Sequence, residues 1–149
     1  MKKKMRINKN QYFLKIAQLA SERSTCPRRK VGCVIVNKHN HIMATGYNGV
    51  PKSYKHCIEE PCPGAGMASG TGLDICKAIH AEQNALLQCP DTMQIETIYC
   101  TTAPCFTCAK LISNTSCEKV IYGEEYVHTE AGKILKECGI ILEYERIIN

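Results

Sequence analysis

The chain has no long apolar run and no large excess of charge of either sign. No stretch of its 149 residues approaches the roughly 20 apolar residues that span a bilayer, which argues against a helical membrane protein. The basic segment 2–6 is not followed by an apolar run, so we expect a solvated tail rather than a signal peptide. We therefore expect a cytoplasmic protein, located in the host cytoplasm if the gene is viral.

The sequence also has no internal repeats and no sign of a second domain. We expect residues 1–149 to form one domain, because this length is sufficient for a hydrophobic core. Nineteen Lys and Arg against 14 Asp and Glu give a formal net charge of +5. This charge suits an anionic substrate, but the lysines are spread along the chain, and general solubility explains most of them.

Cysteine, in contrast, is abundant: the chain has 11, an odd number. Without a secretory signal a disulfide framework is not expected, so metal ligands or buried thiols are the favoured interpretations. Five of the cysteines fall in predicted strands or near predicted helix ends and are expected to be small buried residues. These five are Cys33, Cys89, Cys100, Cys117 and Cys138.

Apolar spacing and turn signals predict four helices and five strands. Helices are expected at 7–23, 79–88, 104–113 and 129–138, and strands at 31–36, 41–45, 95–101, 119–122 and 140–144. The first two strands should form an antiparallel hairpin, and the later ones, joined through helices, should run parallel. We therefore predict a three-layer α/β/α fold with a five-stranded mixed sheet. Residues 51–75 are expected to form an irregular loop that is held in place by a bound group, for example a second metal ion.

A His-x-Glu pair followed by Pro-Cys-x-x-Cys is the most informative pattern. His80, Cys105 and Cys108 can supply three zinc ligands and leave the fourth position open, as in catalytic zinc sites. Glu82 lies two residues from His80, where it can move protons without binding the metal. This residue order is the signature of zinc-dependent nucleobase deaminases. A redox Cys-x-x-Cys would give His80 and Glu82 no role, and a structural zinc site would need a fourth protein ligand.

With these residues in view, the chain resembles the cytidine deaminase-like superfamily and, within it, deoxycytidylate (dCMP) deaminases. The resemblance extends from about residue 24 to residue 144. The segments that carry it are 30–36, 46–51, 79–85, 103–110 and 119–122. The zinc motif alone is typical of the whole superfamily, whereas Gly-Tyr-Asn-Gly-Val-Pro at 46–51 is similar to the dCMP branch.

The resemblance implies hydrolysis of dCMP to dUMP and ammonia, which supplies thymidylate synthesis. It further implies a homo-oligomer, typically a hexamer, activated by dCTP with Mg²⁺ and inhibited by dTTP. Glu82 would take a proton from the zinc-activated water and return protons to N3 and to the leaving amine of cytosine.

Substrate and effector contacts also follow from the resemblance. Asn48 is expected to hold the deoxyribose 3′ hydroxyl, although an Asn-Gly pair is also an ordinary turn. Tyr126 is expected beside the nucleotide, although a half-buried tyrosine is ordinary too. The Thr102–Ala103 backbone is expected to accept from the exocyclic amine, and Ala81 is assigned to the same substrate site. The effector residues would be Gly46, Tyr47 and Gly49, although glycines equally suit a turn.

The substrate phosphate requires cationic or backbone donors. Several basic residues are candidates, and the sequence does not rank them. They are Arg28, Arg29, Lys30, Lys52, Lys55 and Lys110.

A second, structural zinc is expected from four cysteines that precede His80. They are Cys26, Cys57, Cys62 and Cys76. His56 could replace one thiolate, and free thiols or a regulatory disulfide are the alternatives. Some microbial and phage-type dCMP deaminases carry an extra zinc and other members lack it.

Three other functions stay open. A bifunctional dCMP/dCTP deaminase would use the same chemistry. A tRNA adenosine deaminase shares the zinc motif but would need a basic RNA-binding surface, for which the basic residues here are not concentrated. A non-catalytic protein that binds zinc and nucleotide would have no need for Glu82.

Overall fold

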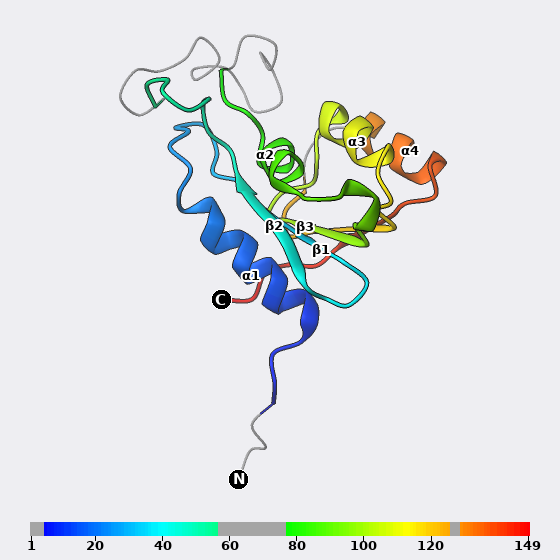
Figure 1. The fold of residues 1–149 in the computed structure, drawn as a ribbon. Helices are drawn as coiled ribbons and strands as arrows, with labels where there is room; N and C mark the ends of the chain where they lie inside the picture. Colours follow the sequence, from blue (N-terminus) through cyan, green and yellow to red (C-terminus); the bar gives the residue numbers. More distant parts are fainter. Residues whose placement is uncertain (1–4, 57–76, 126–128) are drawn as a thin grey trace.

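The structure of the protein, a computed structural model, describes residues 5–56, 77–125 and 129–149. Its centre is a five-stranded sheet between two layers of helices (Figure 1). The strands are β1 (Gly32–Val36), β2 (Ile42–Tyr47), β3 (Thr97–Cys100), β4 (Lys119–Tyr122) and β5 (Ile141–Tyr144), in the order β2-β1-β3-β4-β5. The helices are α1 (Lys9–Ser21), α2 (Ala81–Gln88), α3 (Phe106–Ser113) and α4 (Thr129–Glu137), with a short 3₁₀ helix at Thr92–Gln94.

The sheet is mixed, as the sequence predicts. β1 pairs antiparallel with both β2 and β3, whereas β3, β4 and β5 run parallel. Helices α3 and α4 each connect one strand to its parallel neighbour, which is the connection that such neighbours require, whereas α2 leads from β2 to β3, on the other side of β1. The carboxyl ends of β3 and β4 therefore lie at one edge of the sheet, where α/β proteins place their ligands.

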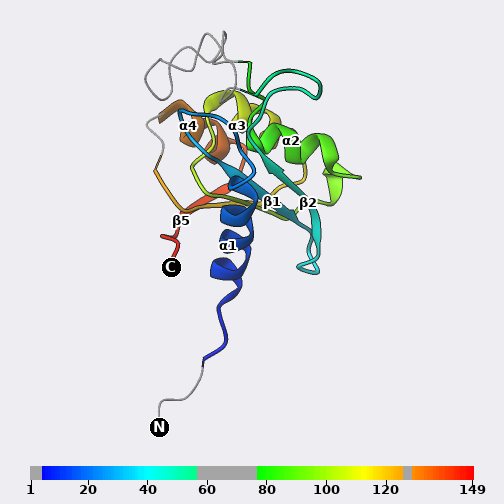
Figure 2. The same cartoon turned by 90° about the vertical axis from the view of Figure 1, so that its left-hand side faces the viewer.

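Strand β1 separates the two hydrophobic clusters of the core. Val34 and Val36 belong to the cluster packed with α1, and Cys33 and Ile35 to the cluster packed with the other three helices. Alternate residues of a strand face opposite sides of the sheet, so this strand is buried on both faces. Figure 2 shows α1 on one side of the sheet and α2, α3 and α4 on the other. The predicted three-layer α/β/α fold is confirmed.

Helix boundaries differ from the prediction at the two ends that matter most. α2 begins at Ala81 rather than at residue 79, because His80 is extended and forms the N-cap (φ −68°, ψ 155°). α3 begins at Phe106, because Cys105 is its N-cap (φ −75°, ψ 173°). The prediction that Pro104 occupies the first helical position is therefore wrong.

Two further comparisons with the prediction concern the cysteines and the membrane. Cys33, Cys100 and Cys117 are buried as expected, but Cys89 is only half-buried and Cys138 is exposed.

Within the described residues, no helix combines the length and the apolar character needed to cross a membrane.

Candidate active site

The N-termini of α2 and α3 meet above the sheet, and each carries metal-ligand side chains at its start. His80 is the N-cap of α2, and its backbone N–H donates to Gln83 Oε1 at 2.8 Å. This bond joins the N-cap to the third helical residue, as in a capping box, and fixes the approach of His80. Cys105 is the N-cap of α3, and Cys108 lies one turn further along. Both sulfurs are thus at the positive end of the helix dipole, which favours thiolates.

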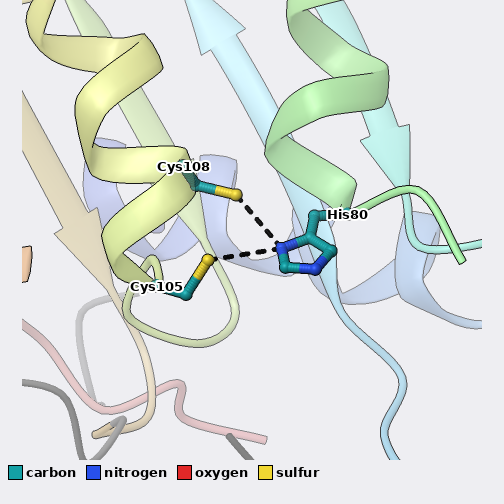
Figure 3. A group of neighbouring side chains, drawn as sticks. All are labelled: His80, Cys105 and Cys108. Atoms are coloured by element: carbon teal, nitrogen blue, oxygen red, sulfur yellow. Dashed lines mark hydrogen bonds between the residues drawn. The ribbon is translucent and has the colours of Figure 1, made fainter. Parts of the chain in front are cut away.

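The three side chains converge on one point (Figure 3). His80 Nδ1 lies 3.2 Å from Cys108 Sγ and 3.4 Å from Cys105 Sγ, and the three ligand atoms are all within 4.8 Å of one another. A tetrahedral zinc with nitrogen and sulfur at about 2.1 and 2.3 Å separates such atoms by about 3.5 Å. The residues therefore fit a zinc ion. Within the described ranges no fourth His, Cys, Asp or Glu belongs to the group, which agrees with a site that keeps one position open.

Hydrogen bonding between the two thiols shifts their pKa values in opposite directions. The hydrogen bond from Cys108 lowers the pKa of Cys105 to about 4, although burial acts in the opposite direction. The pKa of Cys108 is raised by the same hydrogen bond and by burial. The hydrogen bond to Cys105 also raises the pKa of His80. Cysteine binds metals as the thiolate, so both thiols must be deprotonated when zinc binds.

Glu82 lies in the first turn of α2, with 4% of its surface exposed. Burial raises the pKa of its carboxyl group, while hydrogen bonding with Cys108 and the charge of His80 act against the increase. A buried carboxyl group beside the ligand set can both take and return protons near neutral pH.

Comparison with known proteins places most of the chain in one family. A family model for the cytidine and deoxycytidylate deaminase zinc-binding region matches residues 7–124. The chain belongs to this family. The resemblance inferred from the sequence is therefore confirmed, and zinc is the metal of the family.

Two sequence relatives are deoxycytidylate deaminases. The chain is 41% identical over 139 residues to that of Saccharomyces cerevisiae, which covers 91% of this chain and 44% of the yeast protein. It is 41% identical over 122 residues to that of Mycobacterium phage D29, which covers 78% of this chain and 94% of the phage protein. The chain spans less than half the length of the yeast relative but nearly all of the phage one.

The dCMP deaminase of cyanophage S-TIM5, solved in complex with dCMP and dUMP, has the same fold. The TM-score is 0.74 at 30% identity, covering 95% of this chain and 100% of that chain.

In this deaminase-family chain, segment 46–51 holds the start of α2. Gly49 and Ile79 exchange backbone hydrogen bonds of 3.0 and 2.7 Å, and Asn84 Nδ2 donates to the Tyr47 carbonyl at 2.8 Å. A Cβ on Gly46 would collide with the Ala81 carbonyl oxygen, so only glycine permits this approach of β2 to α2. The effector residues predicted from the sequence thus have a structural role beside His80.

Asn48 is 8% exposed and joins two backbone segments. Its Oδ1 accepts from the Val31 N–H at 2.8 Å, and its Nδ2 donates to the Arg29 carbonyl at 2.7 Å. An amide offers two donors and two acceptor lone pairs, so the predicted contact with a 3′ hydroxyl depends on the remaining N–H and lone pair.

The segment between β3 and the cysteine ligands is tied to the neighbouring strand ends. Thr102 is 4% exposed, and the Ala103 N–H donates to the Glu124 carbonyl at 2.9 Å. The predicted contact with an exocyclic amine would therefore be made by the carbonyl oxygens of Thr102 and Ala103. Ala81, the remaining predicted substrate residue, is fully buried at the start of α2. Tyr126 lies outside the described residues.

Of the second proposed zinc site, only Cys26 is described, and it is 8% exposed. Cys57, Cys62 and Cys76 lie outside the described residues. His56 is described, and its Nδ1 lies 3.1 Å from Thr25 Oγ1. The residues adjacent to Cys26 and Cys57 in the sequence are therefore in contact.

Sequence reasoning missed the residues that position the ligands. Gln83 had a usable signal, because it stands three residues after the N-cap, the spacing of a capping box. No sequence signal pointed to the contact of Asn84 with Tyr47 or to the ion pair between Arg29 and Glu124. The residues of these two contacts are 37 and 95 positions apart in the sequence.

Proposed function

We propose that this protein deaminates dCMP hydrolytically to dUMP and ammonia, with zinc as its cofactor. The observation that carries the proposal is a buried carboxyl group, Glu82, beside a His-Cys-Cys ligand set with one position open. The phage D29 deoxycytidylate deaminase supports the choice of substrate, because the alignment covers 94% of its length at 41% identity.

The chemistry divides between the metal and the chain. His80, Cys105 and Cys108 would hold the zinc, which would supply Lewis-acid chemistry by lowering the pKa of a water molecule to about 7. Glu82 would take one water proton as the water oxygen bonds to C4 of cytosine, and would deliver this proton to N3. It would then take the second proton from the new C4 hydroxyl and deliver it to the amine, so that the C4–N bond breaks, ammonia leaves and the C4 carbonyl forms. One carboxyl group can perform both transfers because N3 and the leaving amine each need one of the two protons that the water loses.

The remaining substrate contacts are proposed from the positions of these residues relative to the zinc ligands. The Thr102 and Ala103 carbonyls stand between β3 and Cys105, where they would accept from the exocyclic amine and orient C4. Asn48 would contact the 3′ hydroxyl with the part of its amide that is not bound to the Arg29 and Val31 backbone. Ala81 and Tyr126 complete the proposed set.

The test is the loss of cytosine absorbance on dCMP by zinc-loaded protein, with and without dCTP and Mg²⁺. Turnover of dCMP establishes the activity, and turnover of dCTP as well would indicate a bifunctional enzyme. Zinc-loaded protein that leaves dCMP unchanged would contradict the proposal, and tRNA would then be the next substrate.

A second zinc is proposed at Cys26, Cys57, Cys62 and Cys76. The side-chain contact between Thr25 and His56 supports it, because these two residues stand next to Cys26 and Cys57 in the sequence. Metal analysis should give two zinc ions per chain, and Cys26→Ser should reduce the count to one. A count of one in the unaltered protein would remove the proposal.

Regulation and assembly are proposed from the family resemblance alone. We expect activation by dCTP with Mg²⁺, inhibition by dTTP, a homohexamer and a cytoplasmic location. The packing of Gly46 against α2 accounts for one of the proposed effector residues without an effector. Turnover that responds to neither dCTP nor dTTP would contradict the regulatory proposal, and a measured mass of one chain in solution would contradict the hexamer.

A further inference from the structure

An ion pair joins two loops at the edge of the sheet that carries the active site. Arg29 Nη2 lies 2.6 Å from Glu124 Oε1, across 95 residues of sequence. Arg29 stands shortly before β1, and Glu124 follows the carboxyl end of β4. The pair therefore bridges the ends of strands that are not neighbours in the sheet, since β3 lies between them.

Both partners are bonded to segments that lead to the zinc ligands. The Glu124 carbonyl accepts from the Ala103 N–H, and Ala103 is two residues from Cys105. The Arg29 carbonyl accepts from Asn48 Nδ2, and the next residue, Gly49, pairs with Ile79 beside His80. The backbone of each partner of the ion pair is thus bonded to a segment that we assign to the substrate, 48–49 to the sugar and 102–103 to the base.

We infer that Arg29 binds the 5′-phosphate of the substrate nucleotide and that Glu124 competes with this phosphate for the guanidinium. This inference rests on the proposed function. In the free protein the Glu124 carboxylate occupies Arg29, and a phosphate dianion displaces it. A neutral nucleoside cannot make this exchange, so the pair selects nucleotides over nucleosides.

The exchange is favourable because a phosphate carries more charge and offers more oxygens to the guanidinium than the exposed Glu124 carboxylate does. Arg29 is 29% exposed and Glu124 63% exposed, so water and salt screen their attraction, and such pairs contribute little. A phosphate carries up to two negative charges and offers several oxygens to the fork of a guanidinium, which strengthens both hydrogen bonds. Release of Glu124 leaves its carboxylate in water rather than in the protein interior.

The experiment compares four variants with the unaltered, zinc-loaded protein. They are Arg29→Gln, Glu124→Gln, the double variant, and Glu130→Gln as the matched control. Glu130 is an exposed carboxylate paired with Lys133 at 3.3 Å on α4, so its removal changes the net charge by the same amount. For each protein, kcat and KM are measured with dCMP and with deoxycytidine, together with inhibition by inorganic phosphate.

Arg29→Gln should raise KM for dCMP about 10- to 100-fold, the effect of losing charge-assisted hydrogen bonds, with little change in kcat. Glu124→Gln should lower KM for dCMP about 2- to 5-fold, as expected for loss of an exposed competing charge. Phosphate inhibition should weaken in the first variant and strengthen in the second. Arg29→Gln should lower kcat/KM for dCMP far more than kcat/KM for deoxycytidine, and Glu124→Gln should have no effect on KM for dCMP when Arg29 is absent.

The inference is overturned if Arg29→Gln leaves KM and phosphate inhibition unchanged. It is also overturned if Glu124→Gln weakens nucleotide binding or has the same effect as Glu130→Gln. These failures differ from failure of the proposed function, in which the unaltered protein would not turn over dCMP at all. In that case binding of inorganic phosphate to the same proteins still decides the role of Arg29.

Discussion

At the scale of single residues, burial determines what Glu82 can do. A carboxyl group in water is ionised near neutral pH and is a poor proton donor, whereas 4% exposure raises the pKa of Glu82 and lets it donate as well as accept. The sequence identified this residue from its position two residues after His80. Its burial depends on the packing of α2 against the sheet, which no local pattern contains.

Replacement of Glu82 by Gln should abolish turnover while keeping the metal. The amide has nearly the same shape but cannot exchange protons. Loss of a general acid–base group lowers kcat by about 10²- to 10⁴-fold. Zinc content and kcat on dCMP are the measurements, with Glu130→Gln as the exposed-carboxylate control. An active Glu82→Gln enzyme would show that another group moves the protons.

At the scale of elements, the ligand set depends on the first residues of two helices. His80 and Cys105 occupy N-cap positions, where Ser, Thr, Asp and Asn are usually preferred. Because neither is a typical cap, the sequence placed both helix starts two residues too early and put Pro104 inside α3. The cap positions suit metal binding, since they lie outside the helix and leave the side chain directed at the facing helix.

Gly46→Ala should destabilise the contact between β2 and α2. The added Cβ would collide with the Ala81 carbonyl oxygen and lie 2.6 Å from the Ala85 nitrogen, so backbone must move. Overpacking of this kind costs about 1–3 kcal/mol, and movement of α2 should also weaken zinc binding at His80. Urea unfolding and zinc titration measure the two effects.

The control for this variant is Gly132→Ala in α4. A Cβ there meets only Leu142 Cδ2, at the ordinary contact distance of 3.8 Å. Alanine stabilises a helix interior relative to glycine by about 0.5–1 kcal/mol, so this variant should be more stable. Equal loss of stability in both variants would show that the position of Gly46 is unimportant.

At the scale of the whole molecule, the two ends of the described chain bind each other. Gln11 in α1 is 4% exposed, and its Nε2 donates to Glu145 Oε2 at 2.6 Å and to the Arg146 carbonyl at 2.9 Å. The Ile148 N–H donates to Gln11 Oε1 at 2.9 Å. The segment after β5 thus secures the helix that covers one face of the sheet.

Removal of zinc should lower the stability of the whole fold. The ligands come from two helices, so metal that binds only the folded chain stabilises it by RT ln(1 + [Zn]/Kd), about 4 kcal/mol at 1,000 times Kd. Thermal unfolding before and after chelation, and after zinc is restored, measures this difference. An unchanged Tm would indicate that the metal does not couple α2 to α3.

Alkaline pH should destabilise the fold through two buried groups. Burial raises the pKa of Tyr99 to about 12, and burial raises that of Cys117 to about 12. Above their ordinary values of 10.0 and 9.0 the unfolded chain loses these protons first, so stability is complete below that range and falls as pH rises toward 12.

Tyr99→Phe should flatten this decline, because Tyr99 is 1% exposed and, among the described residues, its hydroxyl bonds to Asn10 at the long distance of 3.4 Å. Urea unfolding between pH 8 and pH 11 gives the comparison. If the variant loses stability as steeply as the unaltered protein, Tyr99 does not contribute to the alkaline decline.

The order of elements, the mixed sheet and the zinc motif were all predictable from the sequence. They depend on spacing within short segments: the buried run of β1, the turn before β2, and the interval between Cys105 and Cys108. The tertiary structure decided the rest. It set the strand order β2-β1-β3-β4-β5, the burial of Glu82, the attachment of Asn48 to the Arg29 backbone, and the pairing of Arg29 with Glu124. These features join residues that are distant in the chain, and their energies exist only after packing has brought the segments together.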